Sequence, residues 1–165
     1  MSWMIRVERP GDEAAIHALT KRAFVGAPYS DGDEADVIDR LRADGDLLLS
    51  LVALERAEII GQVTCSRATL SNGEGGWMVI GPVAVAAEHR GKGLGRALMD
   101  AGETAMRETG AKGITVLGDP KLYSRLGYVQ HTPMTLEGEL GEYLQVKSFG
   151  AAIPSATLIY ASAFG

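Results

Sequence analysis

The sequence predicts an α+β fold, a mixed α/β sandwich in which about four helices flank a central, mostly antiparallel sheet. Two observations lead to this prediction. Three β-rich runs at 47–54, 59–70 and 77–86 follow one another across short polar turns, an order that favours an antiparallel meander. The segment 93–109 then places apolar residues at helical spacing, and such a stripe requires a sheet face or another helix to cover it.

The first third of the chain predicts one strand and two helices. Trp3–Glu8 has the character of a strand, and Asp12 is expected to cap the helix that follows. A Gly- and Pro-containing loop at 26–32 leads to a second helix, which Asp33 opens and Gly45 ends. The first helix carries an apolar stripe of Ile16, Leu19, Ala23 and Phe24.

The remainder of the chain continues the alternation of helix and strand. Gly110 is expected to end the long helix, and Ile114–Leu117 reads as a short buried strand. Pro120–Leu126 predicts a short helix with Asp119 at its cap and proline at its first position. Since no stretch reads as a linker, we expect a single domain over 1–165. Two or three further strands are expected in the tail, among them Tyr143–Phe149 and Thr157–Ala161.

Composition excludes several classes of protein. The 165 residues carry 16 Lys and Arg against 21 Asp and Glu, a net charge of -5 that argues against a general nucleic-acid or anionic-membrane binder. The single cysteine excludes an internal disulfide framework, and the three histidines lie too far apart in sequence to suggest a metal site. The apolar runs are strand-sized, and the N-terminus lacks the apolar run of a signal peptide. A cytoplasmic protein is therefore expected, with a homodimer left open.

The stretch Gly81–Leu98 contains the residues that indicate chemistry: a strand, a glycine-rich turn and a helix start. Glycines in the turn allow close backbone approach, and a helix N-terminus favours a phosphate. Residues 88–96 carry three basic side chains against Glu88, which gives +2 within a chain of net -5. The residues that form this basic turn are Arg90, Gly91, Lys92, Gly93, Gly95 and Arg96.

Two familiar phosphate-binding motifs do not match this turn. A Walker loop requires GxxxxGK[ST], which the sequence lacks. The dinucleotide fingerprint requires a third glycine, and Ala97 and Leu98 follow Gly93-Leu-Gly95-Arg96 instead. A nucleotide-binding α/β protein is therefore disfavoured.

The pattern Arg90-x-x-Gly93-x-Gly95, after a strand and before a long helix, resembles the acetyl-CoA pyrophosphate loop of the GCN5-related N-acetyltransferase (GNAT) superfamily. The resemblance extends over nearly the whole chain, and the strings at 117–128 and 159–164 resemble its YhbS-like branch. It implies a GNAT-like acyl-CoA N-acyltransferase fold with a twisted sheet and a splayed strand pair. It also accounts for Pro82, since the fourth strand would bulge there and leave the fifth; an edge-strand irregularity is the alternative.

The resemblance further implies roles for particular residues. The backbone of Val83, Ala84 and Val85 would bind the pantetheine arm of the cofactor. Tyr123, four residues before Gly127-Tyr128, stands where relatives place a tyrosine beside the cofactor sulfur, so it is the expected catalytic acid. The competing interpretation of Tyr123 is an aromatic residue half-buried on an amphipathic helix.

The implied activity is transfer of acetyl from acetyl-CoA to a primary amine of a small molecule, peptide or protein, by direct attack in a ternary complex. The alternative is a non-catalytic acyl-CoA-binding sensor or scaffold. That alternative stays open because 77–86 contains no ionisable side chain to act as the base. To account for the deprotonation of the amine, we prefer a water relay or an amine that arrives neutral. The side chains considered as the base and disfavoured are Glu74, Glu88, His89, Asp119 and His131. Cys65 is expected to pack within its strand. The acidic segment 31–36 is expected to form a solvated helix start, and the alternative that the resemblance implies is an acceptor wall that attracts a cationic amine.

Overall fold

The central element of the computed structural model is a mixed sheet, and the structure describes residues 2–28 and 30–165. Position 29, inside the predicted loop 26–32, lies outside the described residues. Within them the sheet order is β1-β2-β3-β4-β5-β7-β6, and β8 pairs with β3 beside this path. The strands are β1 (Met4–Val7), β2 (Leu47–Glu55), β3 (Glu58–Leu70), β4 (Trp77–Val85), β5 (Gly113–Leu117), β6 (Val129–Gln130), β7 (Leu144–Ser148) and β8 (Leu158–Tyr160).

The strand pairing confirms the predicted antiparallel meander. β2, β3 and β4 pair in succession and antiparallel, as their short turns require. The parallel pair is β4 with β5, which the long helix between them makes possible. The tail supplies β6, β7 and β8, in agreement with the two or three strands expected there.

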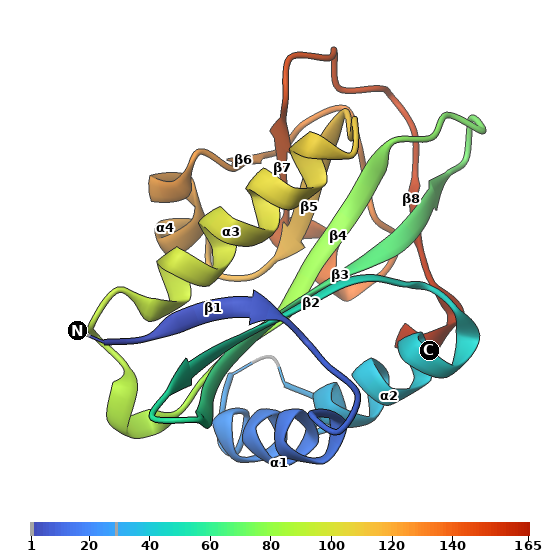
Figure 1. Ribbon diagram of the computed structural model, residues 1–165. Coiled ribbons are helices and arrows are strands. Elements are labelled where there is room, and N and C mark those ends of the chain that lie inside the picture. The colour runs from blue at the N-terminus through green and yellow to red at the C-terminus, as the bar shows by residue number, and fades with distance from the viewer. Residues whose placement is uncertain (1, 29) are drawn as a thin grey trace.

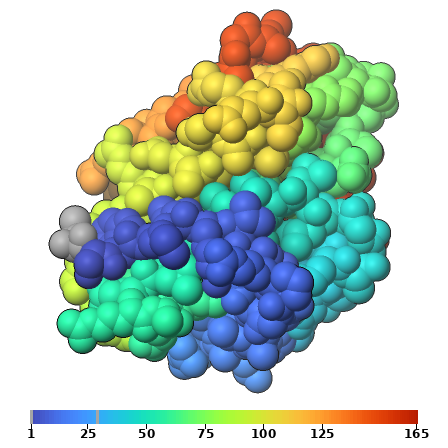
Figure 2. All heavy atoms as spheres, viewed as in Figure 1, coloured from blue at the N-terminus to red at the C-terminus, as the bar shows by residue number. Residues whose placement is uncertain are grey.

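The helices lie on both faces of the sheet, as Figure 1 shows: α3 and α4 on one side, α1 and α2 on the other. In the space-filling view, α3 and the N-terminal segment both lie on the face turned to the viewer (Figure 2). No helix in residues 2–28 and 30–165 has both the length and the apolar character to cross a bilayer. The helices are α1 (Glu13–Ala23), α2 (Glu34–Asp44), α3 (Leu94–Glu108) and α4 (Pro120–Tyr123), with 3₁₀ turns at Ala87–His89, Ser124–Leu126, Glu139–Tyr143 and Ser162–Phe164.

The apolar stripe of α3 packs on the sheet as its periodicity predicts. Gly61 and Gly102 let helix and strand approach closely, because a Cβ on Gly61 would lie 3.0 Å from a Leu98 methyl, and one on Gly102 2.9 Å from an Ile80 methyl. This core holds α3, and therefore the turn before it, in a defined place against the sheet. Its fully buried members include Val63, Cys65, Ile80, Leu94, Leu98 and Met99.

The helix ends follow the sequence prediction at two points and differ at a third. Gly45 ends α2 with φ 76°, and the Asp119 carboxylate accepts the N–H of Lys121 at 2.9 Å, which caps α4. Asp12 stands at the N-cap of α1, but its side chain makes no cap hydrogen bond. Instead its carboxylate oxygens are taken by the Arg6 guanidinium at 2.7 and 3.3 Å and by the backbone N–H of Arg9 at 2.7 Å, donors that precede the helix.

The bulge expected at Pro82 is present in β4. The β3–β4 register runs from Val63 opposite Val83 to Cys65 opposite Ile80, so one β3 residue faces Gly81 and Pro82 together. The pairing of β4 with β5 ends at Val79 opposite Thr115, whereas β4 continues to Val85. The sheet therefore splays beyond the bulge, as the GNAT resemblance implies.

Candidate functional site

A cavity of about 500 Å³ opens where β4 leaves β5. The end of β4, the glycine turn, the first turns of α3, α4 and the end of α1 all contribute to its wall. Its lining residues are Ala23, Phe24, Ala27, Val83, Ala84, Val85, His89, Arg90, Gly91, Gly93, Leu94, Gly95, Arg96, Met99, Leu122, Tyr123, Arg125 and Leu126.

The structure brings nearly all the sequence-predicted site residues to this one cavity. Lys92 is exposed and is not among the lining residues. The residues that sequence reasoning missed come chiefly from α1 and from the turn after α4, and they include Phe24, Met99 and Arg125. The signal at Phe24 was the end of an apolar helical stripe, which does not by itself say which strand the helix end meets. The predicted residues that line the cavity are Val83, Ala84, Val85, Arg90, Gly91, Gly93, Gly95, Arg96 and Tyr123.

The backbone of β4 offers hydrogen-bond donors to this cavity. The N–H of Ala86 donates to Ile60 O at 2.9 Å, so the peptide groups of Ala86 and Ala84 face β3. Because successive residues of a strand alternate, the N–H groups of Val83 and Val85 face the opposite side. On that side β4 is no longer paired with β5, which leaves these two groups directed at the splay.

The glycine turn has a backbone that favours glycine on conformational grounds. Gly91 and Gly93 have φ of 76° and 84°, a region that costs other residues energy, while a Cβ at either would meet nothing within 4 Å. Gly93 is the N-cap of α3, and its carbonyl accepts the N–H of Ala97 at 3.0 Å. The N–H groups of the first turn of α3 thus have no partner within the helix and point toward the turn, where an anion would be favoured.

The Arg90 side chain connects this turn to other parts of the protein. Its Nε donates to Val85 O at 3.2 Å and its Nη2 to Ala23 O at 2.9 Å, which ties the turn to β4 and to the end of α1. Arg96, on the first turn of α3, is exposed as Arg90 is. The positive charge at the mouth of the cavity is therefore supplied by one side chain that also orders the turn and by another that stays free to reach a ligand.

Tyr123 reaches the cavity from α4. Burial raises the pKa of its hydroxyl above the ordinary value, so the group stays protonated throughout the physiological range and can donate a proton. Its ring lies against Gly118, where a Cβ would come within 2.3 Å of Cε2, and at 5.8 Å from the ring centre of Tyr128 in an edge-to-face arrangement. These two contacts restrict where the ring can lie.

The ionisable side chains considered as the general base have structural roles or lie apart from the Tyr123 end of the cavity. Glu74, in the β3–β4 turn, accepts the Trp77 indole N–H at 3.0 Å and pairs with Lys112 at 3.5 Å. His131 is exposed. His89 does line the cavity, in the 3₁₀ turn beside the glycines, with Nε2 4.0 Å from a Glu55 carboxylate oxygen.

Cys65 is a packed strand residue, as its alternating pattern predicts. It is fully buried, and its Sγ would be 3.7 Å from a Cβ built on Gly102. Burial, and secondarily the nearby Glu103 carboxylate, raise the pKa of the thiol to about 12. The thiol is therefore protonated and inert, which excludes an acetyl-cysteine intermediate at this residue.

Two features outside the main cavity have the residue types of a site. His17, Asp36 and Asp39 present ligand atoms within 4.8 Å of one another, a grouping that the sequence spacing did not suggest. However, the two imidazole nitrogens face different carboxylates, Nδ1 toward Asp39 at 2.8 Å and Nε2 toward Asp36 at 4.0 Å, and Arg42 also pairs with Asp39. This arrangement is that of an exposed ion-pair network between α1 and α2.

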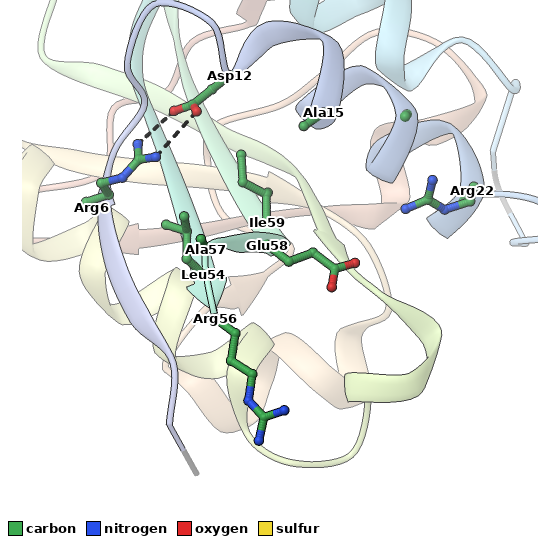
Figure 3. A pocket seen from close by; sticks show the side chains of 10 residues that line it. Arg6, Asp12, Ala15, Arg22, Leu54, Arg56, Ala57, Glu58 and Ile59 are labelled. Atoms are coloured by element: carbon green, nitrogen blue, oxygen red, sulfur yellow. Dashed lines mark hydrogen bonds and ion pairs between the residues drawn. The ribbon is translucent and has the colours of Figure 1, made fainter.

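A second cavity of about 510 Å³ lies between α1 and the β2–β3 turn, shown in Figure 3. The Arg6–Asp12 pair stands at one side of it and Arg22 at the opposite side, while the Arg56 side chain extends away from the others drawn (Figure 3). None of the residues that line it is a sequence-predicted site residue. It is therefore separate from the glycine turn and from Tyr123.

Comparison with known proteins identifies the class to which this fold and cavity belong. Residues 13–128 match the sequence model of the Acetyltransferase (GNAT) family. The chain belongs to this family of acetyltransferases, as the glycine turn and the splayed strand indicated.

Individual relatives agree with this assignment. The chain is similar to a protein named uncharacterized N-acetyltransferase YhbS from Escherichia coli K12, with 40% identity over 126 residues, 76% of this chain and 72% of that one. The structure resembles a GNAT family acetyltransferase from Brucella melitensis in complex with acetyl-CoA, with a TM-score of 0.89, 35% identity and 99% of each chain covered. It also resembles Escherichia coli YhbS in complex with CoA, with a TM-score of 0.86, 32% identity, and 98% of this chain and 91% of that chain covered.

Proposed function

We propose that this chain transfers acetyl from acetyl-CoA to a primary amine, carried by a small molecule or by a peptide or protein, through direct attack in a ternary complex. One observation carries the proposal: the glycine turn, the unpaired N–H groups of β4 and the Tyr123 hydroxyl all face one cavity of about 500 Å³. Relatives solved with acetyl-CoA and with CoA support the choice of cosubstrate. We also propose that 1–165 form a single domain of this kind.

The residues present suit an acyl-CoA. The N–H groups at the start of α3, approached over Gly91 and Gly93, suit the pyrophosphate, and Arg96 adds positive charge. The N–H groups of Val83 and Val85 suit an amide carbonyl of the pantetheine arm and the acetyl carbonyl. These donors stand along one path from the mouth of the cavity to Tyr123.

The chemistry assigns each proton to a group of this chain or to water. An alkyl ammonium, with a pKa of about 10, must lose its proton before it can attack. As the N–C bond forms, a β4 N–H donates to the developing oxyanion, a kind of contact worth about 3 kcal/mol in other enzymes. As the C–S bond breaks, Tyr123 Oη–H donates its proton to the departing thiolate. The nitrogen, cationic after attack, gives its extra proton to water, and Tyr123 regains a proton from water.

The base is not a side chain of β4, since Trp77–Val85 contains no ionisable group. We propose that the amine arrives neutral or gives its proton to water. The same feature supports a second candidate function, a non-catalytic acyl-CoA sensor or scaffold.

Binding is tested by the melting temperature in the presence of ligands. Acetyl-CoA should raise it, whereas ATP and NAD should not. Arg90→Glu with Gly93→Asp should abolish the rise, because both changes place a carboxylate at the pyrophosphate position. Gly45→Asp is the matched control: its φ of 76° and open surroundings resemble those of Gly93, but it ends α2 away from the cavity. A rise with ATP and none with acetyl-CoA would reject the proposal.

Turnover is tested with a panel of amines, by release of CoA thiol and by mass spectrometry of products. Tyr123→Phe should lower kcat while the acetyl-CoA melting shift persists. Tyr160→Phe serves as control, since its buried hydroxyl has no hydrogen-bond partner among the described residues. Binding without turnover on any amine would support the sensor or scaffold instead.

A further inference from the structure

Glu103 stands out among the side chains that face the core. It lies on α3 and is 5% exposed, and it is the one ionisable acid or base in the buried class among residues 2–28 and 30–165, apart from the tyrosines and Cys65. Burying a carboxylate is unfavourable unless it is paired and hydrogen-bonded, and an apolar residue would fill the same position without that cost. The hydrogen-bond partners of this carboxylate therefore indicate its structural role.

Both oxygens of Glu103 are used, by residues from two other parts of the chain. Oε1 accepts from Lys147 Nζ of β7 at 2.5 Å, and Oε2 accepts from the Tyr128 hydroxyl at 3.0 Å. Burial, and then Glu103, raise the pKa of that hydroxyl, which keeps it a donor. We call Glu103, Tyr128 and Lys147 the buried brace.

The buried brace reaches the end of the α4 segment through the Lys147 ammonium. Nζ also donates to Leu126 O at 2.8 Å, at the last residue of the 3₁₀ turn that follows α4. The next residue, Gly127, has φ 92°, and a Cβ there would lie 3.2 Å from Lys147 Cε. One charged group thus connects α3 to the chain that carries Tyr123.

The buried brace also contacts Tyr123 itself. The rings of Tyr123 and Tyr128 meet edge to face at 5.8 Å and 72°, and the N–H of Tyr128 donates to Tyr123 O at 3.1 Å. By contrast, neither α4 nor the 3₁₀ turn after it contains a fully buried residue. Tyr123 and Leu126 pack against the main core but are only partly buried, so the polar contacts of the buried brace add to what orients this segment.

From this geometry we infer that the buried brace positions Tyr123, with Lys147 as the positioning residue that links the Glu103 carboxylate to the turn after α4. The inference rests on the proposed function, in which the Tyr123 hydroxyl protonates the leaving thiolate. Glu103, Tyr128 and Lys147 touch none of the reacting atoms. They act by holding the hydroxyl where the thiolate departs.

The test is a double-mutant cycle of Lys147→Met and Tyr123→Phe, with kcat and KM measured on an amine that the wild type acetylates. Lys147→Met should lower kcat about tenfold or more, as small misplacements of a catalytic group do, and leave KM for acetyl-CoA little changed. In the Tyr123→Phe background it should lower kcat no further. The same factor of loss in both backgrounds would overturn the inference, since a merely structural lysine acts regardless of Tyr123.

Two further variants separate positioning from stability. Lys147→Met alone leaves the Glu103 carboxylate buried and unpaired, so the protein can lose stability for that reason. Glu103→Gln with Lys147→Met removes both charges and should recover melting temperature, yet kcat should stay low because Leu126 O still lacks its donor. Recovery of kcat together with stability would overturn the inference.

Lys112→Met is the matched control, because this lysine pairs with Glu74 in another part of the fold. It should behave as wild type.

A measurement without turnover distinguishes this inference from the proposed function. The chain has 5 tyrosines, so ring-labelled tyrosine gives a small NMR spectrum in which Tyr123→Phe identifies the Tyr123 signal. That signal should move in Lys147→Met and not in Lys112→Met. An unmoved signal overturns the inference. A shifted signal in a protein that acetylates no amine rejects the proposed function and leaves the buried brace as a positioning device for the acyl-CoA cavity.

Discussion

Gly118→Ala is expected to displace Tyr123 while leaving the pyrophosphate end of the cavity intact. A Cβ built on Gly118 lies 2.3 Å from Tyr123 Cε2 and 3.0 Å from Cδ2. Carbon atoms in contact lie about 3.5 Å apart or more, so the ring must retreat by roughly 1 Å. A shift of that size in a catalytic group lowers the rate by about 100-fold. The folded state should lose about 1–3 kcal/mol through overpacking, which in a domain of this size lowers the melting temperature by several degrees.

The assay is kcat with the best amine of the panel, together with the melting shift produced by acetyl-CoA. Gly118→Ala should lower kcat and keep the melting shift. Gly75→Ala is the matched control, since a Cβ there meets nothing within 4 Å and its φ is not positive. Wild-type kcat in Gly118→Ala, at a temperature where the variant is folded, would refute the reasoning that the place of the Tyr123 ring controls the rate.

Three further predictions concern other parts of the molecule. Gly113→Ala should destabilise the fold by about 1–3 kcal/mol in denaturant unfolding, because its Cβ would lie 2.3 Å from the Trp77 ring; a stability equal to wild type contradicts this. Cys65 should resist alkylation at pH 8 in the native protein and react once unfolded, since burial raises its thiol pKa to about 12; labelling of the folded chain contradicts it. The Arg6 hydrogen bond lowers the pKa of Asp12, so the pair should add stability above pH of about 4 and lose it as pH falls through the lowered pKa; melting curves of Asp12→Asn should lack that part of the acid dependence.

The parts of the fold that could be predicted from sequence are those with local signatures. Glycines at 91 and 93 were predicted to allow close backbone approach, and the structure adds a second reason for glycine there, since both have a positive φ. The bulge at Pro82 could be predicted because proline cannot donate to a sheet ladder, and the β3–β4 register shows it. The cap at Asp119 needs only its own neighbours, and it forms as expected.

One expectation differed because of a competing partner from elsewhere in the chain, and the surroundings of two predicted cofactor-binding residues, Arg90 and Lys92, also depended on the tertiary structure. Asp12 has the pattern of a cap, but Arg6 on β1 provides a charged donor that takes its carboxylate. Arg90 has the pattern of a phosphate ligand, and two of its nitrogens are engaged by backbone carbonyls, one of them 67 residues away at Ala23. Lys92 has the same charge and proximity in sequence, yet it does not line the cavity.

The sequence by itself determined the order of the elements, the glycine turn before α3 and the placement of Tyr123 on a short helix after β5. Each of these depends on neighbouring residues, whose conformational preferences act locally. Only the tertiary structure decided which groups meet. Lys147 Nζ donates to Glu103 Oε1 at 2.5 Å although the two residues stand 44 positions apart. The N–H groups of Val83 and Val85 face the side on which β4, among the described residues, is no longer paired with β5. Such contacts depend on how helices and strands pack across the whole chain, and no local pattern encodes that distance.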